Sequence, residues 1–61
     1  MTELQRYKLA SIILQAALNG KVDSEDASDI ASEVIAGKEI NWDDYSESTH
    51  DSLANAFKEV K

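Results

Sequence analysis

The chain has 61 residues, with twelve Asp and Glu against six Lys and Arg, a net charge of −6 and no cysteine. This length excludes a second domain, and a chain of about 60 residues buries only about 60% of the surface that it exposes when unfolded. The lack of cysteine excludes disulfides and thiolate metal sites, and the single histidine, His50, excludes a histidine-rich metal cluster. The protein must therefore gain its stability from helix packing or from oligomerisation.

Residues 2–19 are expected to form the first helix, with Thr2 as its N-cap. Its segment Leu9–Leu18, LASIILQAAL, has eight apolar residues out of ten. On a helix, the apolar side chains from position 9 onward cover about two-thirds of the circumference. The polar side chains fall in one narrow stripe, which consists of Lys8, Ser11, Gln15 and Asn19. A helix this apolar must be packed on several sides, so we place it at the centre of the fold.

The second helix is expected at 24–36, between a capping aspartate and a glycine. Asp23 is a good N-cap, Asp26 stands three residues later as in a capping box, and Gly37 ends the helix. Apolar residues recur at i, i+3, i+4, i+7 and i+8, which predicts one buried face made of Ala27, Ile30, Ala31, Val34 and Ile35. The opposite face carries four acids, Glu25, Asp26, Asp29 and Glu33.

A short helical turn is expected near 41–46. Asn41 and Asp44 have the spacing of a capping box. Trp42 and Tyr45 are three residues apart, so they share one face of a helical turn. With only four aromatic residues in the chain, we expect Trp42 in the core. Tyr45 is left open between the core and an exposed binding surface.

The last helix is expected at about 49–60. Ser48 and Asp51 have the spacing of a capping box and predict its start, and His50 is expected at the surface. The helix has a single apolar stripe, which consists of Leu53, Ala56, Phe57 and Val60. Propensity does not decide whether the turn near 41–46 joins this helix.

These elements predict an all-α protein, a small three-helix bundle with helices at about 2–19, 24–36 and 49–60 and a short extra helical turn near 41–46. We expect a single acidic helical domain over residues 1–61. The connections are short, which favours antiparallel neighbours. The later elements offer just enough apolar residues to cover the first helix, so a homodimer through that helix is permitted but not required.

The apolar run is too short to span a membrane, because it has ten residues and a transmembrane helix needs about 20. Arg6 and Lys8 precede the run as in a signal peptide, but the small-residue cleavage pattern is poor. Leu14 or Gln15 would stand three residues before the candidate cleavage sites. We therefore expect a soluble, cytoplasmic protein that does not bind membranes.

The negative charge is concentrated in the middle of the chain. Residues 23–51 carry ten acids and one lysine, a net charge of −9, whereas residues 1–22 carry +2 and residues 52–61 carry +1. Such a surface repels nucleic acid and attracts basic proteins. The candidate partner-binding residues are therefore Glu25, Asp26, Asp29, Glu33, Asp43, Asp44, Tyr45 and Glu47.

Catalysis and metal binding have little support in the sequence. The only histidine precedes Asp51 on an exposed turn, and a helical chain of this length has little room for a pocket of several hundred cubic ångströms. The run DSEDASD starting at Asp23 resembles an EF-hand loop, but Ser28 stands where glycine is required and Val34 where a glutamate should close the site. We expect no enzyme, no cofactor and no metal site.

Two functions fit these observations. The first is a non-enzymatic interaction module that binds a basic partner protein, such as a small acidic inhibitor or modulator of the phage type that imitates a nucleic acid. Direct binding of nucleic acid is not expected, because the second and last helices carry acids where a nucleic-acid reader needs Lys and Arg for phosphate contacts. The alternative is a structural or assembly subunit that homodimerises through the first helix. An acidic face that serves only solubility would need the same residues.

Overall fold

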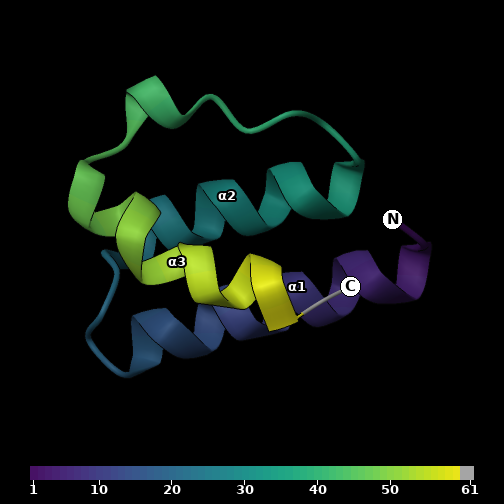
Figure 1. The fold of residues 1–61 in the computed structure, drawn as a ribbon, viewed down its shortest axis with the longest axis horizontal. Helices are drawn as coiled ribbons and strands as arrows, with labels where there is room; N and C mark the ends of the chain where they lie inside the picture. The colour runs from purple at the N-terminus through teal and green to yellow at the C-terminus, as the bar shows by residue number, and fades with distance from the viewer. Residues whose placement is uncertain (60–61) are drawn as a thin grey trace.

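The structure, a computed structural model, describes residues 1–59 and contains three α-helices and one 3₁₀ turn (Figure 1). The elements are α1 (Glu3–Leu18), α2 (Ser24–Ala36), η1 (Trp42–Asp44) and α3 (Glu47–Glu59). No strand occurs within residues 1–59. The predicted small all-α bundle of three helices with an extra turn is confirmed.

The central position of the first helix is also confirmed, because α1 packs extensively on α2 and, over a smaller area, on α3. Figure 1 shows that α1 runs antiparallel to α2, whereas α2 and α3 run in the same general direction. The expectation of antiparallel neighbours is therefore wrong for α2 and α3. The connection 37–46 crosses over α2 and returns the chain to the end where α2 began.

The core joins one apolar face from each helix. Its largest fully buried side chains are Leu9 and Ile13 from α1, Ile30 from α2 and Leu53 from α3, each with no exposed surface. Small buried residues lie among them and let the helix backbones approach closely: Ala10, Ala27, Ala31 and Ala56. The faces predicted from the helical periodicity of the second and last helices are thus the ones that face the core. The exceptions to full burial are Phe57, which is half-buried against the core, Ile35, which is 40% exposed, and Val60, which lies outside the described residues.

The apolar surface of α1 is only partly covered. Its exposed side includes Leu4, Tyr7, Leu14 and Leu18, and Leu18 is 81% exposed. The expectation that the later elements suffice to cover this helix is therefore wrong, because their buried faces contact only one side of it. Within residues 1–59, no helix combines the length and the apolar character needed to cross a membrane.

The ends of α1 and the start and end of α2 are set by capping residues that can be identified in the sequence. Thr2 and Gln5 form a reciprocal capping box, in which Thr2 Oγ1 accepts from the Gln5 N–H at 3.2 Å and Gln5 Oε1 accepts from the Thr2 N–H at 2.7 Å. Asp23 Oδ1 accepts from the N–H of Glu25 at 2.8 Å and starts α2. Both helices end at a glycine with φ of 75°, Gly20 and Gly37, in the backbone pattern of a Schellman motif.

The start of α3 differs from its prediction. The helix begins at Glu47, two residues earlier than expected, and Ser46 rather than Ser48 caps it. Ser46 Oγ accepts from the Thr49 N–H at 3.3 Å, and the Ser46 carbonyl accepts from the His50 N–H at 3.1 Å. Tyr45 has extended backbone angles (φ −123°, ψ 158°), so η1 and α3 are separate.

The cap at Asp23 yields a prediction about stability. We expect Asp23→Ala to lower the free energy of unfolding by about 1 kcal/mol, because two N–H groups at the start of α2 lose their acceptor. Urea denaturation followed by circular dichroism measures the loss. The matched control is Asp29→Ala, which removes the same charge from an exposed position in the interior of α2 and should change stability by less than about 0.5 kcal/mol. Equal losses would contradict a capping role.

Candidate protein-binding surface

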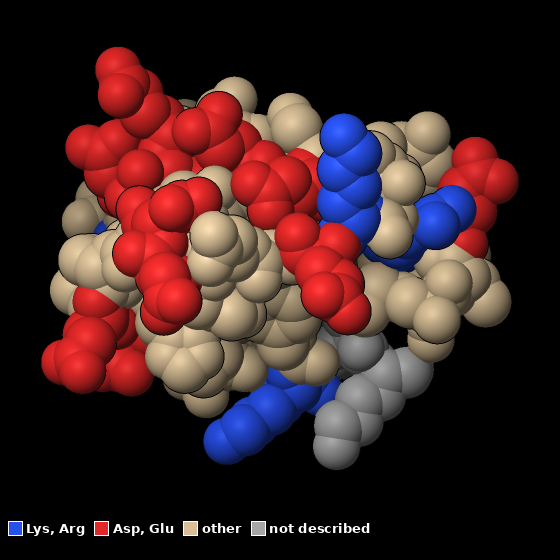
Figure 2. All heavy atoms as spheres, turned by 90° about the horizontal axis from the view of Figure 1, so that it is seen from above, with Lys and Arg blue, Asp and Glu red and all other residues tan. Residues whose placement is uncertain are grey.

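The acids of α2 form one face because the cap at Asp23 fixes the helical register. Glu25, Asp29 and Glu33 then follow at intervals of four, with Asp26 beside them. Glu25 and Asp29 are exposed on the side away from the core, whereas Asp26 and Glu33 stand one turn before and after the buried Ile30 and are half-buried. Figure 2 shows acidic side chains gathered over the left and centre of this face of the molecule, with Lys and Arg side chains to the right of them and at the lower margin. These four acids of α2 are the first acidic row of the surface.

The second acidic row lies on the connection between α2 and α3. Asn41 Oδ1 accepts from the Asp43 N–H at 3.3 Å, which opens the turn as Asp23 opens α2. The N–H of Tyr45 then donates to the Trp42 carbonyl at 3.1 Å and closes the turn. Asp43 and Asp44 consequently stand exposed on a turn whose shape is set by its own backbone.

Tyr45 joins the two rows. Its hydroxyl donates a hydrogen bond to Glu33 Oε1 at 3.0 Å, and the side chain is half-buried. Burial, the hydrogen bond to Glu33 and the negative charges of Glu33, Asp29 and Asp44 raise the pKa of Tyr45 to about 12. Two of these three acids belong to α2 and one to the turn. The phenol is thus a neutral donor among carboxylates that were predicted as separate rows.

A second contact ties the start of α3 to α2. Thr49 is buried, and its Oγ1 donates to Asp26 Oδ2 across 3.5 Å and lies 3.1 Å from Ser46 Oγ. Glu47 is an exposed acid in the first turn of α3, next to this contact in the chain. Thr49 and Ser46 were not among the predicted site residues. Their spacing of three, as in other side-chain caps, is the sequence signal that could have found them.

Trp42 anchors the turn on α3. Its ring packs edge-to-face against Phe57, Tyr45 and His50, with centroid distances of 5.6, 6.4 and 4.8 Å. Trp42 is half-buried and packs against the core, as expected. His50 is exposed, as expected, but its ring covers the Trp42 indole. The acidic turn is therefore held from two sides, by Trp42 on α3 and by Tyr45 on α2.

The carboxylates of this surface are available to a partner. Among the side chains of residues 1–58, none of the acids on α2 or η1 lies within 4.0 Å of a Lys or Arg nitrogen, and the one ion-pair contact joins His50 and Asp51 at 4.0 Å. Over the same residues, no three His, Asp or Glu side chains converge closely enough to hold a metal ion. Rows of unpaired carboxylates of this kind attract cationic groups over several ångströms.

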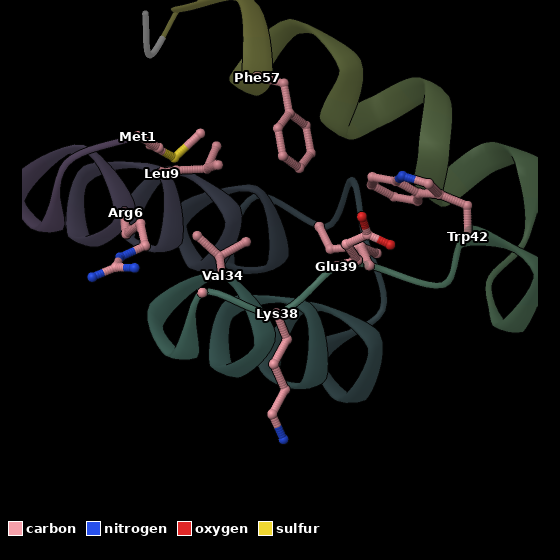
Figure 3. Close-up of a pocket in the computed structure, with 10 residues that line it drawn as sticks. Met1, Arg6, Leu9, Val34, Lys38, Glu39, Trp42 and Phe57 are labelled. Atoms are coloured by element: carbon pink, nitrogen blue, oxygen red, sulfur yellow. The ribbon is translucent and has the colours of Figure 1, made fainter.

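A cavity lies beside this surface, between the start of α1, the residues that follow α2, and α3 (Figure 3). Its volume is about 500 Å³, so the expectation that a chain this short has little room for such a pocket is wrong. Most of its lining is apolar, and Figure 3 shows Phe57 and Trp42 facing Leu9 and Val34 while Lys38 extends away. The described lining residues include no hydroxyl, thiol or imidazole group that could act as a nucleophile or base.

All eight predicted site residues thus lie on α2, the turn and the first turn of α3, and three of them take part in the hydrogen bonds that join these elements: Asp26, Glu33 and Tyr45. Asp29 and Asp44 act on Tyr45 through their charge. The other three, Glu25, Asp43 and Glu47, are exposed first-turn acids of their elements. Comparisons of the chain with protein-family models, with curated proteins and with solved structures found no match.

The Tyr45–Glu33 contact predicts an unusual titration. Tyr45 should form tyrosinate near pH 12 rather than 10, which the ultraviolet absorbance of tyrosinate measures as the difference between the native chain and Tyr45→Phe. Because the folded state holds this proton more tightly than the unfolded chain, the resulting stabilisation is complete below about pH 10 and is lost as the pH rises to about 12. Tyr7→Phe is the control. Titration of Tyr45 near pH 10 would disprove the contact.

Proposed function

We propose that this protein is a cytoplasmic, non-enzymatic interaction module whose acidic surface binds a basic partner protein. The observation that carries the proposal is the hydrogen bond from Tyr45 to Glu33, which joins the acids of α2 and of the turn into one surface. Within residues 1–58, no carboxylate of α2 or of the turn forms an ion pair with Lys or Arg, and the segment 23–51 concentrates a charge of −9. A basic protein gains the most from contact with such a surface.

The spacing of the charges favours a partner that normally binds nucleic acid. Such proteins present Lys and Arg in rows that contact successive phosphates. Glu33 is held by Tyr45, and the charges of Asp29 and Asp44 act on the same phenol, so several negative charges gather around one point as they do along a phosphate backbone. An acidic protein of this kind occupies the nucleic-acid site and acts as an inhibitor or modulator. The resemblance to small phage-encoded inhibitors is an analogy of charge and size.

The order of the surface favours binding over mere solubility. A solubilising face needs charge but no fixed arrangement of its side chains. Here the acidic turn is held on α2 by Tyr45 and on α3 by Trp42, and the contacts fix side chains at a cost in conformational entropy. They also gather the negative charges of Glu33, Asp29 and Asp44 around one phenol, and like charges repel. A basic partner that neutralises these charges relieves the repulsion, and this relief adds to the free energy of binding.

The test is capture of partners by the immobilised protein from an extract of its host, at low and high salt. We expect a basic protein to be retained at low salt and released as salt rises, with duplex DNA competing for it. Asp29→Asn combined with Asp44→Asn should weaken the binding at least about tenfold, because both carboxylates belong to the array around Tyr45.

The matched control combines Glu39→Gln with Asp51→Asn. It makes the same change in net charge, from −6 to −4, at two exposed acids that do not act on Tyr45. This variant should keep most of the binding. Equal loss in both double variants would mean that only net charge matters. Retention that is insensitive to salt, or a partner that DNA does not displace, would contradict the nucleic-acid mimic.

A further inference from the structure

The exposed apolar residues of α1 form a regular stripe. Leu4, Tyr7, Leu14 and Leu18 are 66%, 52%, 44% and 81% exposed, and the exposed Ser11 stands between them. The steps along positions 4, 7, 11, 14 and 18 alternate between three and four residues. This is the spacing that keeps side chains in line along the seam between two paired helices.

The stripe is a second apolar face and not an edge of the core. At 100° per residue, Leu18, Ser11 and Leu4 lie on the side of α1 opposite Leu9 and Ile13, which are fully buried. A face that exposes four large apolar side chains over four turns of helix, interrupted only by Ser11, is rarely left open on a monomeric protein. A chain of this length buries little apolar surface of its own and gains stability from each further apolar side chain that it buries. The exposed stripe therefore indicates that something covers it.

We propose that a second copy of this chain covers the stripe, with the two α1 helices packed side by side and parallel. The four large side chains expose on the order of 500 Å² in each copy, so a symmetric pair buries about 1,000 Å², the lower end for a specific interface. Ser11, at the middle of the stripe, is small enough to let the two helices approach closely. The proposal is independent of the acidic surface and its partner.

Charge complementarity selects the parallel orientation. Glu3 and Lys8 lie on opposite flanks of the stripe, and in a parallel pair each flanking residue faces the position five residues further along the other helix. Glu3 therefore faces Lys8 of the second copy, and the two-fold axis repeats this pair. An antiparallel pair would set Glu3 near the alanines at the far end of α1 and would form neither ion pair.

The distribution of charge in the chain also favours α1 as the interface between two copies. Each copy carries −6, so two copies repel each other wherever their acidic surfaces meet. Residues 1–22, which include α1, carry a net charge of +2 with Glu3 as their one acid, whereas residues 23–51 carry −9. Pairing through α1 thus joins the least acidic segments and leaves both acidic surfaces free.

Sedimentation equilibrium of the full chain tests the proposal. We expect a dimer at about 100 µM, in keeping with an interface of this size. Leu14→Glu should raise the dissociation constant at least about tenfold, and circular dichroism should show a folded chain because Leu14 is exposed. The control, Asn55→Glu, adds the same charge at an exposed position of α3 and should leave the dimer intact. A monomeric native chain, or equal effects of the two variants, would overturn the proposal.

The orientation is tested with cysteines, since the native chain has none. In the parallel pair, Leu4→Cys and Ser11→Cys each form a disulfide with the same position of the second copy under mild oxidation, and Asn55→Cys does not. A mixture of Glu3→Lys and Lys8→Glu chains should form mixed dimers in preference to either homodimer, because both ion pairs are restored only in the mixture. Cross-linking of Leu4→Cys only to Leu18→Cys would show an antiparallel pair and overturn the parallel arrangement.

Discussion

The packing of α1 on α2 is the contact on which the other features of this protein depend. Alanines at the contact let Ile13 and Ile30 be buried completely, and this close approach fixes which side of α2 faces outward. Glu25 and Asp29 then point to solvent, and Asp26 and Glu33, at the border of the buried face, meet α3 and the turn. α1 is apolar around most of its circumference, and α2 and α3 contact only one side of it. The exposed stripe therefore remains.

Local signals in the sequence predict α2 most accurately. Asp23 and Gly37 mark its ends through the geometry of one turn each, so its predicted bounds agree with the structure. The start of α3 could not be predicted in this way, because Ser46 and Ser48 are equally good caps as isolated residues. The choice is made by contacts distant in sequence: Tyr45 bonds to Glu33, and Thr49 is buried against Asp26. Because of these contacts, α3 begins two residues before its predicted start.

The same distinction separates what could be predicted of the binding surface from what could not. Helical periodicity places the acids of α2 on one face, and a capping pattern places Asp43 and Asp44 on a turn. That the two groups meet depends on the path of the connection 37–46 and on the hydrogen bond from Tyr45, twelve positions after Glu33. The 500 Å³ cavity arises from the same path, which no local pattern determines.

The acidic surface and the apolar stripe on α1 would bind their partners through different forces, and they lie on different elements. The acidic surface is a matter of charge and would act at a distance, with a strength that salt reduces. The stripe on α1 is a matter of apolar area, which acts on contact and depends little on salt. Because the stripe lies on α1 and the acids on α2, the turn and α3, occupying one surface leaves the other free. A parallel pair would present two acidic surfaces related by a two-fold axis, and a partner that is itself two-fold symmetric could bind both and gain in avidity.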